Sequence, residues 1–188
     1  MLVNAPNLVT LLRILLIPLI VGVFYVPDAW LSDQAKNITA TAVFIVAAVT
    51  DWLDGYLARR LNQMSAFGAF FDPVADKLVV VAALIVLLKL GRVDMVVGLI
   101  IIGREIAISA LREWMATLGQ GRSVAVAFIG KLKTVLQMVA IPLLLFDDWL
   151  LGLIDCYALG TVLIYVAALL TVVSMLYYLR RALPLMRG

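Results

Sequence analysis

Residues 51–76 read DWLDGYLARRLNQMSAFGAFFDPVAD and place acidic residues where two long apolar segments of the chain meet. The segments cover residues 38–58 and 73–90, and each has roughly the 17 to 25 residues that cross a bilayer as a helix. A carboxylate in the middle of a membrane helix costs about 2.5 to 3.5 kcal/mol on insertion scales, and less near the interface. We therefore expect two antiparallel helices, joined by a loop around residues 62–67, whose carboxylates need cations beside them.

The rest of the chain extends this apolar pattern. Of its 188 residues 65% are hydrophobic and 14% are charged, with a mean hydropathy of +1.11, a balance that does not suit a water-exposed surface. Segments of spanning length cover residues 8–26, 38–58, 73–90, 95–116, 125–146 and 157–179. No linker, repeat or low-complexity stretch separates them. We predict an all-α integral membrane protein, a single domain over residues 1–188, with six transmembrane helices around a polar cavity that faces the cytoplasm.

Composition narrows the chemistry that the chain can perform. It has no histidine and one cysteine, Cys156, which excludes histidine-based triads, Cys/His zinc sites and a disulfide within the chain. Transfer or hydrolysis must then depend on carboxylates, hydroxyls, lysine, arginine and hard metal ions. We also expect the first apolar segment to be retained, because no basic residue precedes it and Arg13 lies inside it.

Charged residues predict how the helices are oriented. With both termini in the cytoplasm, the outer loops hold only three of the 15 basic residues, Lys36, Lys89 and Arg92, as expected when positive charge concentrates on the inner side. Half of the 12 acidic residues lie in or beside the outer loops, namely Asp28, Asp33, Asp94, Asp147, Asp148 and Asp155. The other acidic residues fall near the inner helix ends, where we expect the site.

Two pairs of aspartates are spaced to face one another there. Asp51 and Asp54 stand at i and i+3, and Asp72 and Asp76 at i and i+4, so each pair shares one helix face. Oxygen ligands of this kind suit Mg²⁺ or Mn²⁺, and two such ions stabilise the attacking and leaving oxygens of phosphoryl transfer. Taken singly, Asp72 before Pro73 also fits a helix cap with proline at the first helical position. Asp51 or Asp54 could likewise pair with a nearby arginine.

Taken together, residues 51–76 resemble the signature of the CDP-alcohol phosphatidyltransferase family, D-x-x-D-G-x-x-A-R-x8-G-x-x-x-D-x-x-x-D, at every specified position. By this resemblance two divalent ions, Mg²⁺ or Mn²⁺, are bound by Asp51, Asp54, Asp72 and Asp76, and Asp76 is also the general base. The resemblance assigns contacts with the CDP group to Asp54, Gly55, Ala58, Arg59 and Gly68. Small residues at these positions also permit close helix packing, and Arg59 also fits an ordinary interface cation.

A second polar cluster, within residues 103–137, predicts the other half of the site. Its candidates for binding an acceptor phosphate are Arg104, Arg112, Lys131 and Lys133. Cations beside a metal site favour an acceptor that carries phosphate over serine or choline. Each arginine could instead pair with Glu105, Glu113 or an aspartate of the signature. The two lysines stand at i and i+2 and cannot fully share a helix face, so spacing leaves open which of them binds.

Three further stretches sharpen the resemblance: residues 4–13, 103–113 and 130–137 look like bacterial members of the family whose acceptor is sn-glycerol 3-phosphate. The resemblance implies transfer of a phosphatidyl group from CDP-diacylglycerol to that acceptor with release of CMP. It also implies a homodimer in the bacterial inner membrane, surrounded by lipid, with no nucleic-acid partner. Alternatives are a family member that uses inositol phosphate, serine or choline, or, from another class, an aspartate-lined divalent-cation transporter.

Overall fold

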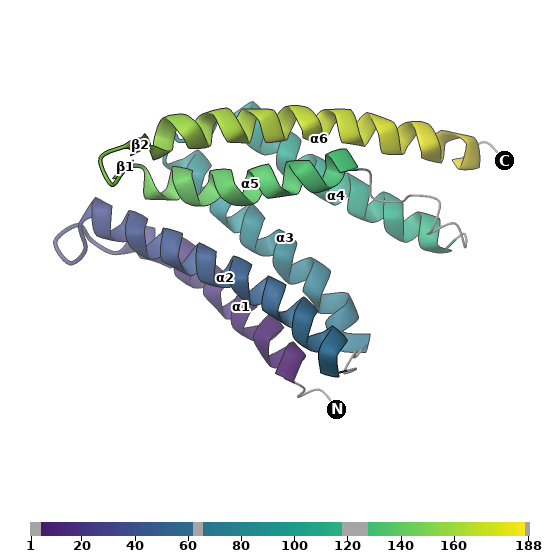
Figure 1. Ribbon diagram of the computed structural model, residues 1–188, viewed down its shortest axis with the longest axis horizontal. Coiled ribbons are helices and arrows are strands. Elements are labelled where there is room, and N and C mark those ends of the chain that lie inside the picture. The colour runs from purple at the N-terminus through teal and green to yellow at the C-terminus, as the bar shows by residue number, and fades with distance from the viewer. Residues whose placement is uncertain (1–4, 62–65, 118–127, 187–188) are drawn as a thin grey trace.

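The computed structural model describes residues 5–61, 66–117 and 128–186. Within these ranges the chain forms long helices and one very short hairpin (Figure 1). The elements are α1 (Ala5–Gly22), the 3-10 turn η1 (Val23–Tyr25), α2 (Asp33–Leu61), α3 (Ala66–Lys89), α4 (Met95–Thr117), α5 (Phe128–Phe146), β1 (Trp149–Leu150), β2 (Ile154–Asp155) and α6 (Cys156–Met186). The six α-helices coincide with the apolar segments, as the prediction requires.

The helices pack as two groups that share a core. α1 packs along both α2 and α3, whereas α6 packs along α5 and α4 (Figure 1). α2 against α5 joins the groups, and a single buried cluster draws apolar side chains from all six helices. Representatives of that cluster are Ile20, Phe44, Leu84, Ile101, Ile141 and Ile164. The core therefore lies where the two groups meet.

Helix boundaries differ from the predicted segments where polar residues continue a helix. α2 begins at Asp33 and α6 continues to Met186, because hydropathy delimits only the apolar part of each helix. α3 begins at Ala66, so Asp72 and Pro73 lie inside it and the predicted cap at Asp72 is wrong. An interior proline costs a backbone hydrogen bond, which neighbouring elements of a membrane protein can replace. The Asp72 side chain instead accepts a hydrogen bond from α1.

The turn after α3 shows why the predicted break at residues 90–92 forms. Gly91 has a φ of +70°, a left-handed conformation that glycine adopts without strain. Its N–H donates to Leu88 O at 3.1 Å, and Arg92 N–H donates to Leu87 O at 2.9 Å. This pair of bonds is the Schellman ending, which satisfies the last carbonyls of a helix. α4 can therefore start close to the end of α3.

Arg92 connects the helix ends that lie beside this turn. Its guanidinium donates to the carbonyls of Leu144 and Leu145, at 3.2 and 3.0 Å, and so completes the end of α5. It also donates to Asn37 Oδ1 on α2 at 3.0 Å and pairs with Asp147 at 2.9 Å. Burial lowers the pKa of Arg92 from its usual value, although Asp147 opposes that shift. One side chain therefore ties the ends of α2, α3 and α5.

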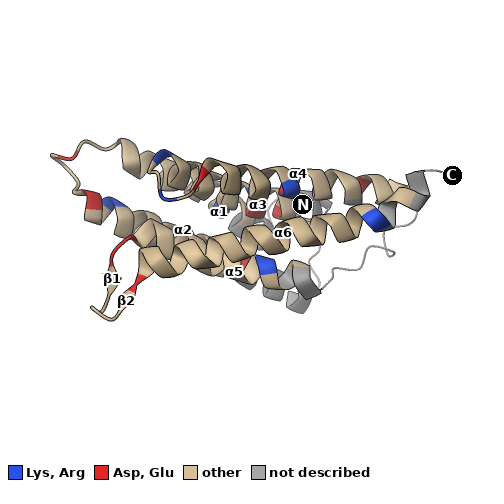
Figure 2. Cartoon of the chain, turned by 90° about the horizontal axis from the view of Figure 1, so that it is seen from above, with Lys and Arg blue, Asp and Glu red and all other residues tan. Residues whose placement is uncertain are grey.

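Most of the helix surface is apolar. Large hydrophobic side chains are exposed on every helix, for example Leu15, Val49, Ile85, Leu99, Val135 and Leu169. Several acidic residues instead lie at the hairpin end (Figure 2). Within the described residues one stretch, Cys156–Arg180, is long and apolar enough to span a membrane by itself, and Thr10–Tyr25 and Leu132–Phe146 are shorter apolar stretches. An apolar exterior of this extent is characteristic of proteins that contact lipid or partners.

Candidate active site

α2 and α3 bring Asp51 and Asp76 together around a residue of α1. Arg13 Nη1 lies 3.1 Å from Asp51 Oδ1 and also donates to Asp76 Oδ1. The Arg13 side chain is 1% exposed, whereas the carboxylates of Asp51 and Asp76 are 46% and 41% exposed. The predicted meeting of carboxylates from these two helices is therefore observed for this pair.

A second contact from α1 reaches Asp72, the third predicted metal ligand whose side chain is described. Thr10 Oγ1 donates a hydrogen bond to Asp72 Oδ1 at 2.6 Å, and Thr10 is buried. Thr10 and Arg13 stand one turn apart on α1, so one helix face serves both contacts. α1 thereby becomes part of the carboxylate cluster, although its side chains were not among the predicted site residues.

Several predicted residues have backbone positions but no described side chains. Asp54, Gly55, Ala58 and Arg59 lie in α2, and Gly68 lies in α3. Their side chains lie outside the part of the chain that the structure describes, as do those of Arg112 and Lys131. Their assigned roles therefore stay predictions.

The described aspartates suit a hard cation in chemistry and partly in arrangement. Carboxylate oxygens are the ligands that Mg²⁺ and Mn²⁺ prefer, and Asp51 and Asp76 already share one cationic group. Among residues 5–61, 66–117 and 128–186, no three acidic side chains whose positions are described converge closely enough to enclose an ion. The residues therefore fit a divalent ion through the shared position of Asp51 and Asp76, and the full ligand set is a proposal.

The carboxylates of Asp51 and Asp76 lie at a cavity of about 210 Å³ that the second cluster also lines. Its lining includes Arg13, Asp51 and Asp76 from the first cluster, and Glu105 of α4 and Lys133 of α5 from the second. The remaining polar lining comes from Lys77, Thr134 and Gln137. Segments far apart in the sequence therefore meet at one cavity that both carboxylates and cations line.

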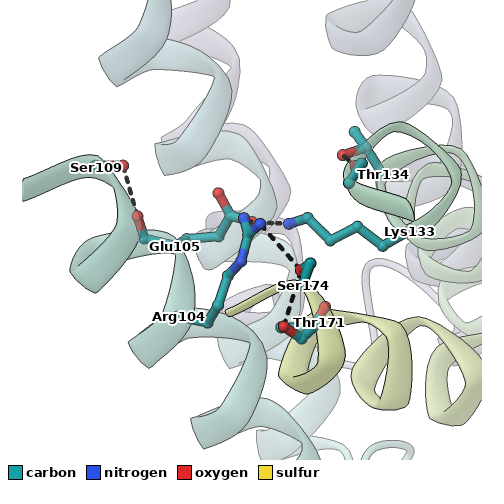
Figure 3. Close-up of polar contacts among 8 residues, drawn as sticks. Arg104, Glu105, Ser109, Lys133, Thr134, Thr171 and Ser174 are labelled. Atoms are coloured by element: carbon teal, nitrogen blue, oxygen red, sulfur yellow. Dashed lines mark hydrogen bonds and ion pairs between the residues drawn. The ribbon is translucent and has the colours of Figure 1, made fainter. Parts of the chain in front are cut away.

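Glu105 organises the cationic side of the cavity (Figure 3). Its Oε1 accepts from Arg104 Nη1 at 3.0 Å and also from Lys133 Nζ. Arg104 Nη2 donates to Ser174 Oγ of α6 at 3.2 Å, and the guanidinium lies 5.9 Å from the centre of the Tyr178 ring. Arg104 and Lys133 are both buried. The pairing of Arg104 with Glu105, one of the partners that the sequence allowed, is therefore observed.

Of the predicted acceptor residues with described side chains, the cavity reaches one. Lys133 lines it, whereas Arg104 is directed to Glu105 and α6 and does not line it (Figure 3). Spacing alone left the choice between the two lysines open, and the structure places Lys133 at the cavity.

The sequence did contain a signal for the residues of α1 that were missed. Arg13 interrupts an apolar segment, and an ionisable residue inside a membrane helix marks a functional position more often than not. Thr10 stands three residues earlier, the same spacing that drew attention to Asp51 and Asp54.

Comparison with known proteins gives the family. The CDP-alcohol phosphatidyltransferase family matches residues 3–173 of the chain. The chain is a member of that family. The family signature of this phosphatidyltransferase, residues 51–76, begins on α2 and ends on α3. Its first and last aspartates, Asp51 and Asp76, line the cavity.

Curated relatives within this phosphatidyltransferase family are similar along nearly the whole chain. The protein named CDP-diacylglycerol–glycerol-3-phosphate 3-phosphatidyltransferase from Salmonella choleraesuis (strain SC-B67) is 49% identical over 181 residues, which cover 95% of this chain and 94% of that one. The protein of the same name from Escherichia coli (strain K12) is 50% identical over the same coverage. These similarities extend through α4 and α5, which carry the second cluster, as well as the family signature.

Proposed function

We propose that the protein transfers the phosphatidyl group of CDP-diacylglycerol to sn-glycerol 3-phosphate and releases CMP. The relatives that bear this activity in their name are 49% and 50% identical over 95% of the chain. The observation that carries the proposal is the one cavity that Asp51, Asp76 and Lys133 all line. A diphosphate lipid and a phosphorylated acceptor need opposite charges at neighbouring positions, and this cavity offers both.

The carboxylate side is proposed to bind the donor. Asp51, Asp54, Asp72 and Asp76 would hold two divalent ions, Mg²⁺ or Mn²⁺, which supply charge neutralisation for the diphosphate when bound. Gly55, Ala58, Arg59 and Gly68 would contact the CDP group, since small residues admit a nucleotide and arginine pairs with phosphate. The lipid tails would remain in the membrane beside the apolar surface of the helices.

The cationic side is proposed to orient the acceptor. Lys133 Nζ would bind the phosphate of sn-glycerol 3-phosphate, with Arg104, Arg112 and Lys131 as further candidates for that role. Asp76 would accept the proton of the acceptor's 1-hydroxyl. The hydroxyl oxygen then forms a bond with the lipid-side phosphorus as the bond to CMP breaks. The exposure of the Asp76 carboxylate, 41%, is consistent with contact with a bound acceptor.

The membrane arrangement belongs to the same proposal. Helices of 18 to 31 residues measure about 27 to 46 Å at a rise of about 1.5 Å per residue, enough for six spans with some tilt. Both termini and the cavity would face the cytoplasm of a bacterial inner membrane, because only three of the 15 basic residues, Lys36, Lys89 and Arg92, fall in the loops at the opposite, hairpin end. The polar substrates are then available from the cytoplasm. The protein would work as a single domain and assemble as a homodimer.

An acceptor assay tests the activity. Purified protein in detergent, with CDP-diacylglycerol and Mg²⁺ or Mn²⁺, is offered radiolabelled sn-glycerol 3-phosphate, inositol phosphate or serine in parallel. Labelled lipid and stoichiometric CMP are expected with glycerol 3-phosphate alone. A preference for another acceptor would retain the family and overturn the proposed acceptor. Metal uptake into proteoliposomes without any CMP would instead favour a cation transporter.

A further inference from the structure

α1 supplies a cation to the carboxylate cluster from outside the family signature. Arg13 lies in α1, whereas the signature occupies residues 51–76. The Arg13 side chain is 1% exposed in a helix that is otherwise largely apolar. A buried guanidinium keeps its charge under all ordinary conditions and therefore needs anionic partners.

Its partners belong to two different helices. Arg13 Nη1 contacts both carboxylates, with Asp51 Oδ1 at 3.1 Å and Asp76 Oδ1 as a second acceptor. The three side chains also line the same cavity. The buried guanidinium thus lies between two half-exposed carboxylates and contacts one oxygen of each.

A divalent ion bound by Asp51 and Asp76 would use these same oxygens. Two like charges at one group of ligands oppose each other, and a neighbouring unit charge changes the proton affinity of a carboxylate by about 1 to 3 pKa units. A divalent ion that binds those oxygens is repelled by the positive charge of Arg13 through the same electrostatic effect. Arg13 and a divalent ion are therefore in direct competition, electrostatically and for ligand atoms.

We propose that Arg13 is a positioning residue that joins Asp51 to Asp76 and weakens divalent-cation binding by competing for their oxygens. The inference rests on the proposed function, because it needs these aspartates to bind the ions. A site of moderated affinity would let ions arrive and leave with the diphosphate substrate. Thr10 supports the arrangement, since its bond to Asp72 fixes α1 against α3 one turn from Arg13.

Metal titration of substrate-free protein tests the proposal. Purified protein in detergent, freed of metal with a chelator and then dialysed, is titrated with Mn²⁺ by calorimetry and by thermal unfolding. Arg13→Gln is expected to bind Mn²⁺ about tenfold more tightly than the unsubstituted protein, by the same charge effect. Its unfolding temperature in chelator should fall, and Mn²⁺ should raise it by more than in the unsubstituted protein.

Two matched variants separate charge from packing. Arg13→Lys keeps the positive charge and is expected to stay within about threefold of the original affinity, as the charge effect predicts. Leu15→Ala changes a side chain of the same helix that is 65% exposed, and it should not alter Mn²⁺ affinity. Weaker or unchanged Mn²⁺ binding by Arg13→Gln would overturn competition.

A second measurement does not depend on Arg13→Gln. Side-chain N–H resonances of isotope-labelled arginine in the unsubstituted protein should include one that shifts when Mg²⁺ is added, and that signal should be absent from Arg13→Lys. No shift at saturating Mg²⁺ would refute displacement of Arg13. If neither the protein nor its variants bind Mn²⁺, the proposed metal site itself fails, whereas equal binding by all of them refutes only the role of Arg13.

Discussion

The two sides of the cavity are built on opposite plans. On the carboxylate side one base, Arg13, lies between two acids, Asp51 and Asp76. On the cationic side one acid, Glu105, lies between two bases, Arg104 and Lys133. In each group the central residue offsets one of the two outer charges and leaves one net charge of the outer type. The comparison teaches that charge inside the helix bundle can be balanced locally while the two groups bring opposite net charges to one cavity.

The largest effect is expected from replacing Asp76, which is one of the two acids around Arg13 and also the proposed general base. Asp76→Asn should lower the transfer rate by about a thousandfold, within the range of general-base contributions. The protein should stay folded, because Arg13 keeps Asp51 as a partner. Transfer is measured as CMP release, and folding by thermal unfolding in the same detergent.

Asp94→Asn is the matched control for that experiment. Asp94 accepts a hydrogen bond from Val96 N at the start of α4, away from the cavity, and asparagine can replace it there. Its activity should be unchanged. Near-normal transfer by Asp76→Asn would remove Asp76 from the base role.

Removing the central acid of the other side should mainly affect folding. Glu105→Gln leaves Arg104 and Lys133, both buried, without the carboxylate that joins them. The expected loss of stability is about 3 kcal/mol, the low end for breaking a buried ion pair. Thermal or denaturant unfolding in detergent measures it.

Glu113→Gln offers a control on the same helix, because Glu113 is exposed. It should change stability little. Equal losses from both substitutions would show that Glu105 has no special role at the centre of its group.

An outer base should affect acceptor binding more than folding. Lys133→Met removes the one predicted acceptor residue with a described side chain that lines the cavity, and it should raise KM for sn-glycerol 3-phosphate by about ten- to a hundredfold, the value of a hydrogen bond to a charged group. KM for CDP-diacylglycerol should stay nearly constant. Steady-state kinetics with each substrate varied in turn give both values.

Lys89→Met provides the comparison variant, since Lys89 lies at the other end of α3, over the Tyr25 ring. Its kinetics should match those of the unsubstituted protein. A parallel rise of both KM values in Lys133→Met would point to general disruption of the cavity instead.

The smallest expected effect, a modest loss of stability, is at the hairpin end, where Arg92 stabilises the fold. Arg92→Met loses the bonds to Asn37, Leu144 and Leu145 and should cost about 1.5 kcal/mol. KM and kcat measured below the unfolding temperature should not change, because Arg92 is remote from the cavity lining. Gln34→Ala, which removes an exposed bond to Asp148, is the control and should be nearly neutral. A kinetic change in Arg92→Met would mean that this end communicates with the site.

Much of the architecture could be predicted from local properties of the chain. The apolar segments located all six helices, and Gly91 located the turn between α3 and α4. The cap at Asp72 was predicted wrongly because Asp-Pro has the same local appearance before a helix and inside one. The two-residue strands were missed, since Trp149–Leu150 and Ile154–Asp155 are too short for any periodicity.

The candidate site was likewise only partly predictable from the sequence. The spacing of residues 51–76 indicated that carboxylates of α2 and α3 should meet, and Asp51 and Asp76 do so. Spacing could not reveal that α1 enters this cluster, because helix periodicity describes one helix and carries no information about its neighbours. Spacing could not reveal either that Lys133 lines the cavity beside Glu105 of α4, and the role of Lys131 stays a prediction.

The sequence by itself determined the apolar helices, the family signature and the presence of acids and bases that require compensation, because composition and spacing are local properties. Only the tertiary structure decided which charge compensates which. Arg13 joins Asp51 to Asp76, and Glu105 joins Arg104 to Lys133, through contacts that span 28 to 63 residues wherever two helices are involved. Such partners are selected by helix packing, which acts over distances that no sequence window covers.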